Sequence, residues 1–136
     1  MATNPPITIR IFTNVPAPGS GVTSAWAQTI SQYLAPTAWV AMTPLTGGWA
    51  NIGGGNPVAQ YRKEGDVVRL RGAMNSGTIG SACFTLPAGF RPPNILHLAG
   101  GGGTYCDIVI DTAGLVTPSA GPTTAMWINV SFSTVA

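Results

Sequence analysis

From Trp39 to the C-terminus, apolar and polar residues alternate along short segments bounded by Gly, Pro, Asn and Asp. An alternation with a period of two residues is the pattern of a half-buried β-strand. The clearest case is residues 58–71, where two such segments flank Glu64-Gly65 and predict a hairpin with a two-residue turn. The facing pairs in that register are Tyr61–Val68 and Ala59–Leu70 on the apolar side, and Gln60–Arg69 and Val58–Arg71 on the polar side.

Further strands follow the same pattern toward the C-terminus. Segments 82–86, 95–99 and 106–110 alternate, and Asp111-Thr112-Ala113-Gly114 predicts a turn into another strand. The last segment places Met126, Ile128, Val130 and Phe132 on one face, with Trp127, Asn129 and Ser131 on the other. About seven short strands with closely spaced turns predict an all-β fold. We expect an antiparallel β-sandwich of jelly-roll type over residues 37–136.

Residues 1–36 follow a different pattern and form the second predicted region. A short strand at residues 7–11 and a proline-rich linker at residues 14–21 precede a period of three to four residues. Trp26, Ile30 and Leu34 would then share one face of a short helix that ends before Pro36. A helix this short is marginal in water, so its apolar face must pack on something. That partner is the chain's own β domain, symmetry mates around a three-fold axis, or a larger assembly.

Composition changes this picture mainly through its lack of charge. Asp, Glu, Lys and Arg make up 7% of the 136 residues, against about 25% in a typical soluble domain. The 18 Gly and 12 Pro could indicate disorder, but the many aromatic and β-branched residues predict folded strands instead. A surface so poor in charge is expected to be partly covered by other chains, which predicts a homo-oligomer.

The net charge of +2 is too small and too dispersed to predict a nucleic-acid partner. No apolar stretch is long enough to predict insertion into a membrane. Residues 1–10 lack the basic and apolar regions of a signal peptide, so we expect the protein to be made in a cytoplasm and released only by assembly and lysis.

Candidate chemistry is sparse, and we expect no enzyme, cofactor or metal. The chain has one His and four acidic residues, and it lacks a Gly-x-Ser-x-Gly motif. Cys83, His97 and Cys106 lack the close spacing of a zinc site. The alternation turns Cys83 outward beside core-facing Phe84 while Cys106 faces the core, which predicts two free thiols.

Four segments resemble the C-terminal head modules of bacteriophage tail-fibre, baseplate and receptor-binding proteins. They are residues 39–51 (WVAMTPLTGGWAN), 60–72 (QYRKEGDVVRLRG), 84–93 (FTLPAGFRPP) and the turn at 111–116 (DTAGLV). The predicted helix also resembles the short helix that often precedes such heads, so the resemblance covers about residues 22–136. It departs from the family at Thr124-Ala125-Met126-Trp127, where a Ser-Leu-Asp-Gly-type segment is usual, and in lacking a fibre shaft.

The resemblance implies a homotrimer on the virion surface that contacts other virion proteins through its N-terminal arm and often recognises a host cell-surface saccharide. Candidate saccharide-binding residues are Trp49, His97, Tyr105 and Asp107, because aromatic faces and hydrogen-bonding groups suit a sugar ring. The ordinary alternatives are a core or interface role for Trp49, a surface strand position for His97, and a subunit contact for Tyr105 and Asp107. A second hypothesis is a purely structural virion protein, such as a capsid decoration, head-fibre or tail-tip protein, with no ligand.

Overall fold

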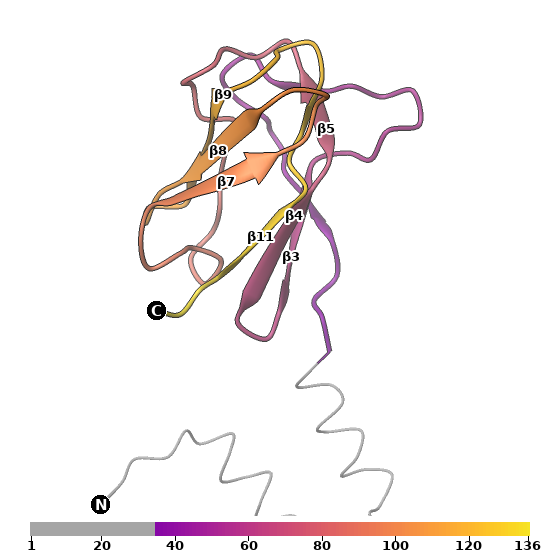
Figure 1. Cartoon of the computed structure of the whole chain (residues 1–136). Helices are drawn as coiled ribbons and strands as arrows, with labels where there is room; N and C mark the ends of the chain where they lie inside the picture. The colour runs from indigo at the N-terminus through magenta and orange to yellow at the C-terminus, as the bar shows by residue number, and fades with distance from the viewer. Residues whose placement is uncertain (1–34) are drawn as a thin grey trace, which may run out of the picture. The chain divides into compact units, whose positions relative to one another are not determined.

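The structure is a computed structural model, and it describes residues 35–136 (Figure 1). The strand, linker and helix expected within residues 1–34 lie outside the described residues, as do the candidate oligomer contacts Trp26, Ile30 and Leu34. The unit Pro36–Ala136 is all-β, with eleven strands and no helix within the described part of the chain. All of its strand pairings are antiparallel. The predicted fold class is confirmed at this level.

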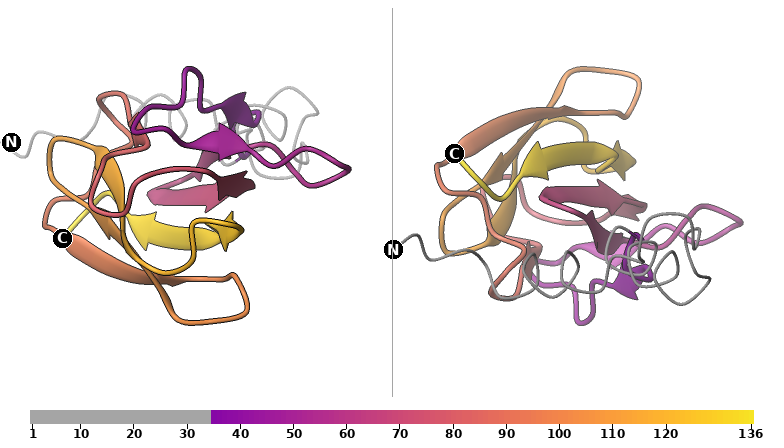
Figure 2. Two further views of the ribbon diagram at one scale, coloured as in Figure 1. Left: turned by 90° about the horizontal axis from the view of Figure 1, so that it is seen from above. Right: turned by 90° about the horizontal axis from the view of Figure 1, so that it is seen from below.

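The strands form three sheets (Figures 1 and 2). The first sheet has the order β1-β3-β4-β11 and comprises Val40–Ala41, Gln60–Glu64, Val67–Arg71 and Val130–Ser133. The second sheet has the order β10-β5-β2 and comprises Met126–Trp127, Ala73–Asn75 and Ala50–Asn51. The third sheet has the order β6-β9-β8-β7 and comprises Phe84–Thr85, Leu115–Ala120, Cys106–Ile110 and Leu96–Gly100.

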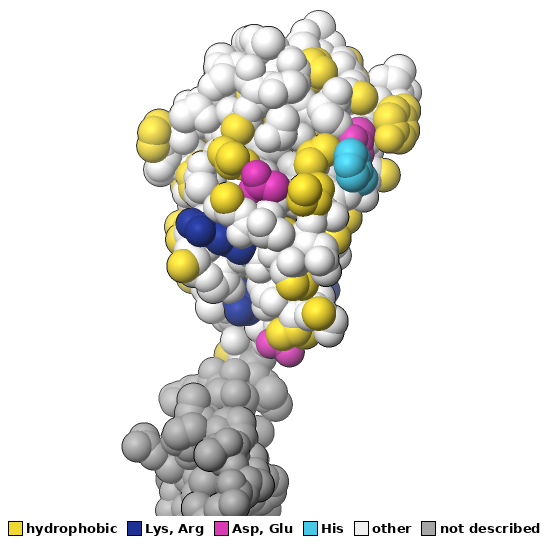
Figure 3. All heavy atoms as spheres, turned by 90° about the vertical axis from the view of Figure 1, so that its left-hand side faces the viewer, with side chains coloured by type: hydrophobic (Ala, Val, Ile, Leu, Met, Phe, Trp, Pro, Cys, Tyr) yellow, Lys and Arg dark blue, Asp and Glu magenta, His cyan; other side chains and the backbone are white. Residues whose placement is uncertain are grey.

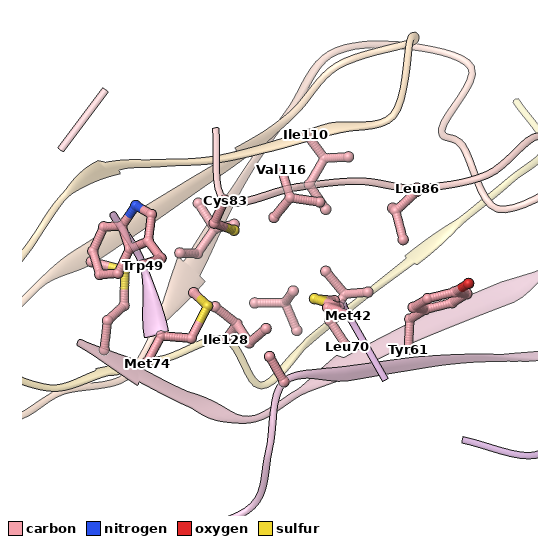
Figure 4. Close-up of a cluster of buried hydrophobic side chains, with 14 of the residues drawn as sticks. Met42, Trp49, Tyr61, Leu70, Met74, Cys83, Leu86, Ile110, Val116 and Ile128 are labelled. Atoms are coloured by element: carbon pink, nitrogen blue, oxygen red, sulfur yellow. The ribbon is translucent and has the colours of Figure 1, made fainter. Parts of the chain in front are cut away.

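The first and third sheets share one hydrophobic core (Figure 4). Val68 and Leu70 of β4 are buried, as are Ile108 and Ile110 of β8, and all four belong to a single cluster. In Figure 4 the side chains of Ile110 and Val116 lie across the core from Leu70. Because strand side chains alternate between two faces, each of these sheets has its polar positions on the side away from the core. The polar residues that could bind a ligand lie on those two outer faces.

The hairpin at residues 58–71 forms with the predicted faces but with a different turn. Ala59, Tyr61, Val68 and Leu70 are all buried, as the alternation predicts. However, Tyr61 pairs with Leu70 and Glu64 pairs with Val67, so the turn is Gly65-Asp66 and the predicted register is wrong by two residues. Gly65 has a φ of 57°, which suits glycine as the first central residue of a two-residue hairpin turn. A register shift of two residues preserves each side chain's face, so the predicted faces are correct although the predicted partners are not.

The predicted last strand is divided between two sheets. Met126, Ile128, Val130 and Phe132 are all buried, which confirms the alternation. Met126 belongs to β10 of the second sheet and Val130 to β11 of the first. The neighbouring strand divides at the same level, between β4 and β5 at Gly72, whose carbonyl accepts a hydrogen bond from the Ile128 N–H at 3.0 Å. A Cβ on Gly72 would lie 2.4 Å from the Ala59 Cα, so glycine permits the close approach of the chain at Ala59 to the point where β4 ends and β5 begins.

Both cysteines are free thiols, as predicted, but the predicted orientation of Cys83 is wrong. Cys83 is fully buried, together with Cys106 and Leu86. The strict alternation fails because β6 is only two residues long, Phe84–Thr85, and Cys83 and Leu86 flank it on the core side. Burial raises the pKa of the Cys83 thiol to about 12, so it stays protonated at neutral pH.

Candidate functional site

The third sheet brings together two of the four predicted site residues on its outer face. His97 of β7 lies opposite Val109, two pairs along the ladder from Asp107 of β8, which lies opposite Ala99. The His97 Nδ1 is 2.9 Å from the Asp107 Oδ2. Figure 3 shows the histidine, in cyan, beside an acidic side chain at the surface. The His97 side chain is 68% exposed and that of Asp107 only 12%, so the imidazole is open to solvent over a largely covered carboxylate.

A β-bulge completes this cluster with a residue that the sequence pattern did not indicate. Ile108 pairs with Pro118 whereas Asp107 pairs with Ala120, so Ser119 is an extra residue in β9. The displaced Ser119 hydroxyl donates a hydrogen bond to the Asp107 Oδ2. This bond, followed by the contact with His97, holds the pKa of Asp107 below its ordinary value. Asp107 is therefore an anion fixed by two donors on neighbouring strands.

Tyr105 is the most exposed aromatic side chain of the described residues. It is 71% exposed and directly precedes β8, two residues before Asp107. Since side chains two apart along an extended segment point to the same side, its ring belongs to the outer face of the third sheet. The outer face of the third sheet thus carries an exposed aromatic ring, a fixed carboxylate and an imidazole, the kinds of group that a saccharide site requires.

Trp49 does not belong to this group, and the candidate role as a stacking face is corrected. It is only 3% exposed and belongs to the hydrophobic core. A Cβ built on Gly77 would lie 1.9 Å from a carbon of the indole, so the ring rests directly on the glycine backbone. A ring covered in this way has no free face for a sugar. The core role that the sequence left open is the one observed.

The outer face of the first sheet carries a second polar surface, which sequence reasoning missed. Arg62 and Arg69 face each other directly on β3 and β4, and Arg71 lies two residues further along β4. The guanidinium carbons of Arg62 and Arg71 lie 4.6 Å and 4.0 Å from the centre of the Trp39 ring. A shallow groove of about 280 Å³ opens beside them, lined by Trp39, Arg69, Leu70, Arg71, Asn129, Val130 and Ser131.

A signal for this second surface is present in the sequence. Arg62, Arg69 and Arg71 occupy outward positions of the predicted hairpin, and a turn at Gly65-Asp66 places Arg62 opposite Arg69. The predicted turn lies one residue too early, and it pairs Gln60 with Arg69 instead. The contact with Trp39 joins the residue before β1 to side chains of β3 and β4, and no local spacing indicates it.

The four segments at residues 39–51, 60–72, 84–93 and 111–116 contact one another in the structure. The Tyr61 ring packs against Phe90 with centroids 5.1 Å apart, and the Lys63 Nζ donates a hydrogen bond to the Gly89 carbonyl at 2.8 Å. The Leu86 N–H donates to the Gly114 carbonyl, and the first segment joins the second through the stacking of Arg62 on Trp39. These segments therefore belong to the structural framework of the unit, apart from the candidate site at Tyr105 and Asp107.

The described residues give little support to a metal site, a membrane-spanning helix or a nucleophilic triad. Within residues 35–136, no three His, Cys, Asp or Glu side chains are placed to hold a metal ion together. The described residues also include no helix with the length and apolar character that crossing a membrane requires. The His97–Asp107–Ser119 cluster is not a nucleophilic triad, because the serine hydroxyl donates to the carboxylate and not to the imidazole. No family model matches the chain, and no curated protein matches it either.

Proposed function

We propose that this chain is a non-enzymatic virion protein of a bacteriophage, the trimeric head of a tail fibre or receptor-binding protein that recognises a host cell-surface saccharide. The observation that carries the proposal is the outer face of the third sheet. There a 71% exposed Tyr105 directly precedes β8, two residues before Asp107, the carboxylate that Ser119 and His97 hold in place. Such an aromatic surface offers apolar contact to a sugar ring, and the neighbouring polar groups offer partners to its hydroxyls.

The resemblance to phage heads supports the proposal because the similar segments contact one another within the folded unit. The four similar segments are distant in sequence, yet each of them contacts at least one of the others. Two sheets with a common core suit an antiparallel β-sandwich of jelly-roll type. We place the protein on the virion surface after assembly in the host cytoplasm, with residues 1–36 as the arm that meets other virion proteins.

The proposed saccharide site is shallow, and its strength would come from repetition. A single site of this kind is expected to bind with a Kd of about 0.1–1 mM, or about −4 to −5.5 kcal/mol. Three identical sites on one trimer would raise the apparent affinity by avidity. We expect a cleft between protomers to add further contacts, since the Asp107 Oδ2 already bonds to both Ser119 and His97.

The same internal bonding favours the second candidate, a purely structural virion protein. Because Asp107 is already bonded within the sheet, the cluster could serve only to fasten β7, β8 and β9 together. Tyr105 would then be covered by a neighbouring subunit in a capsid decoration, head-fibre or tail-tip protein.

Replacing Tyr105 with Ala tests the proposal. The variant is expected to lose binding to host cells at least tenfold, because the loss of the ring contact is multiplied across three sites. Its melting temperature should change little, because a 71% exposed side chain adds little to the core. Adsorption of the fluorescently labelled full-length protein to host cells measures the first effect, and calorimetry measures the second.

Val135→Ala provides the matched control for this experiment. Val135 is also an exposed apolar residue, at 54%, but it lies near the C-terminus and outside the candidate site. It should adsorb like the parent protein. Normal adsorption by Tyr105→Ala would contradict the saccharide site, and its dissociation into monomers would support the structural candidate. Light scattering distinguishes these outcomes and tests the trimer itself.

A further inference from the structure

We infer that the groove on the outer face of the first sheet binds the carboxylate of an acidic sugar. This site is separate from the one around Tyr105 and does not depend on it. The groove is lined by Arg69 and Arg71 on β4, Asn129 and Ser131 on the adjacent chain segment, and Trp39 across the sheet. We identify its ligand from the charge of the lining residues and from the volume of the groove.

The charge of the groove is unbalanced. Arg62 and Arg69 lie directly opposite each other, an arrangement of like charges that destabilises a strand pair unless an anion compensates it. Glu64 contacts both guanidiniums, and the hydrogen bond from Arg69 lowers its pKa, so it is ionised. One carboxylate thus serves two arginines, and within the described residues Arg71 has no carboxylate partner at all.

Contacts within the protein fix the Arg71 guanidinium in place before a ligand binds. The Arg71 guanidinium stacks on Trp39 and donates two hydrogen bonds to the Gln60 Oε1, at 3.0 Å from Nε and 2.9 Å from Nη2. An arginine has five N–H donors, so three remain on Arg71. A guanidinium fixed by an aromatic ring presents these donors as a planar fork, the geometry that matches a carboxylate.

The size and composition of the groove favour a sugar acid. Its volume of about 280 Å³ lies just below the usual range of small-molecule pockets, roughly 300–1,000 Å³, which suits a ligand of one ring and its substituents. Asn129 and Ser131 add uncharged hydrogen-bonding groups, as sugar hydroxyls require. A nucleic acid would call for a basic stripe that follows a backbone of phosphates, whereas the basic side chains lining this groove are Arg69 and Arg71 alone.

Titration with D-glucuronate tests this inference on the full-length protein. NMR signals of the Arg69 and Arg71 Nε–H groups should shift with glucuronate and stay in place with D-glucose at the same concentration. Arg71→Gln should raise the Kd for glucuronate about tenfold, the usual effect of losing a charge-assisted hydrogen bond. Arg71→Lys keeps the charge but loses the planar fork, so its Kd for glucuronate should lie between those of the parent protein and of Arg71→Gln.

Lys63→Gln is the matched control, because it removes one positive charge from the same hairpin outside the groove. Lys63 donates to the Gly89 carbonyl and does not line the groove. This variant should bind glucuronate within about twofold of the parent protein, since exposed charges at a distance are screened. Melting curves for each variant show that the fold is kept.

Three outcomes would overturn the inference. The first is equal shifts with glucose and glucuronate, which would remove the role of the carboxylate. The second is equal loss of affinity in Lys63→Gln and Arg71→Gln, which would reduce the effect to net charge. The third is displacement of glucuronate by inorganic phosphate or a short oligonucleotide at a lower concentration, which would indicate another anion. Tyr105→Ala should leave glucuronate binding unchanged, so this test fails or succeeds independently of the proposed function.

Discussion

The outer faces of the first and third sheets differ in the sign of the charge that they carry and in the contacts that hold the charged groups. Both are exposed sides of antiparallel sheets that share one core. On the first sheet, cations outnumber anions, and the aromatic ring of Trp39 holds the guanidiniums of Arg62 and Arg71. On the third sheet, the Asp107 carboxylate is held by the hydroxyl of Ser119 and the imidazole of His97.

The two faces leave different groups free to contact a ligand. On the third sheet the bonds within the cluster occupy the Asp107 Oδ2, so the exposed Tyr105 is the group left to make contact. On the first sheet the internal bonds leave several N–H donors of Arg71 and an excess of positive charge. We therefore expect apolar contact to dominate on one face and charge to dominate on the other.

Both faces are built on a common core, so Gly77→Ala should destabilise them together. A Cβ at Gly77 would lie 1.9 Å from the Trp49 ring, which cannot move within a packed core. Overpacking of this kind costs about 3 kcal/mol, a large share of a typical total of about 5–15 kcal/mol. Urea unfolding would measure the loss, and both faces should unfold in the same transition.

Gly54→Ala is the control for this prediction. Gly54 has a φ of 60°, and a Cβ placed on it would have nothing within 4 Å, so the substitution adds strain without a clash. The expected cost is about 1–2 kcal/mol. If Gly77→Ala cost no more than Gly54→Ala, the ring of Trp49 would not be fixed against the glycine, and its assignment to the core would be wrong.

Acid should weaken the two faces through their two carboxylates. Asp107 and Glu64 both have a pKa in the folded protein below the ordinary value. Their stabilising contribution is therefore complete above the unfolded pKa values of about 4 and is lost as pH falls through the folded values. Asp107→Asn should destabilise the protein at pH 6 and much less at pH 2.5, as urea unfolding at the two pH values would show.

Glu64→Gln tests the first sheet in the same way, because Glu64 belongs to a network of ion pairs that is partly open to solvent. Its effect should have the same sign but should shrink in 0.5 M salt, since exposed charges are screened. The effect of Asp107→Asn should persist in salt, because its hydrogen bond from Ser119 is largely covered. Equal salt sensitivity in both variants would remove this distinction between the two faces.

The faces of strands are easier to predict from this sequence than their partners. Alternation depends on neighbours in the chain, so the predicted buried positions of the hairpin and of the segment ending at Phe132 are correct. Register depends on which residue forms the turn, and Gly65 lies first in the turn rather than second. The outward orientation predicted for Cys83 is wrong because it extends the alternation through β6, a strand too short to maintain it.

For the candidate sites, the limit is contact between distant segments. Local composition identifies both His97 and Asp107, and the pairing of β7 with β8 brings them together. It does not identify Ser119, because the approach of Ser119 to Asp107 depends on a bulge in β9. Trp39 likewise reaches Arg71 across a sheet. Trp49 is ambiguous because a tryptophan between small residues suits a core and a surface equally well, and only the packing on Gly77 decides.

The smallest expected effect is that of His97→Gln on stability. The His97 side chain is 68% exposed, and a contact made by a side chain so open to water contributes little, about 0.5 kcal/mol. Ser119→Ala should cost more, about 1 kcal/mol, because it removes the hydrogen bond that contributes most to lowering the pKa of Asp107. Urea unfolding at pH 7 would measure both. If His97→Gln cost as much as Ser119→Ala, the imidazole would be a structural part of the sheet, with no capacity left for a ligand. A negligible cost would instead leave the imidazole free to contact a ligand on the same face as Tyr105, and the two faces would then differ only in the charge of the groups they offer.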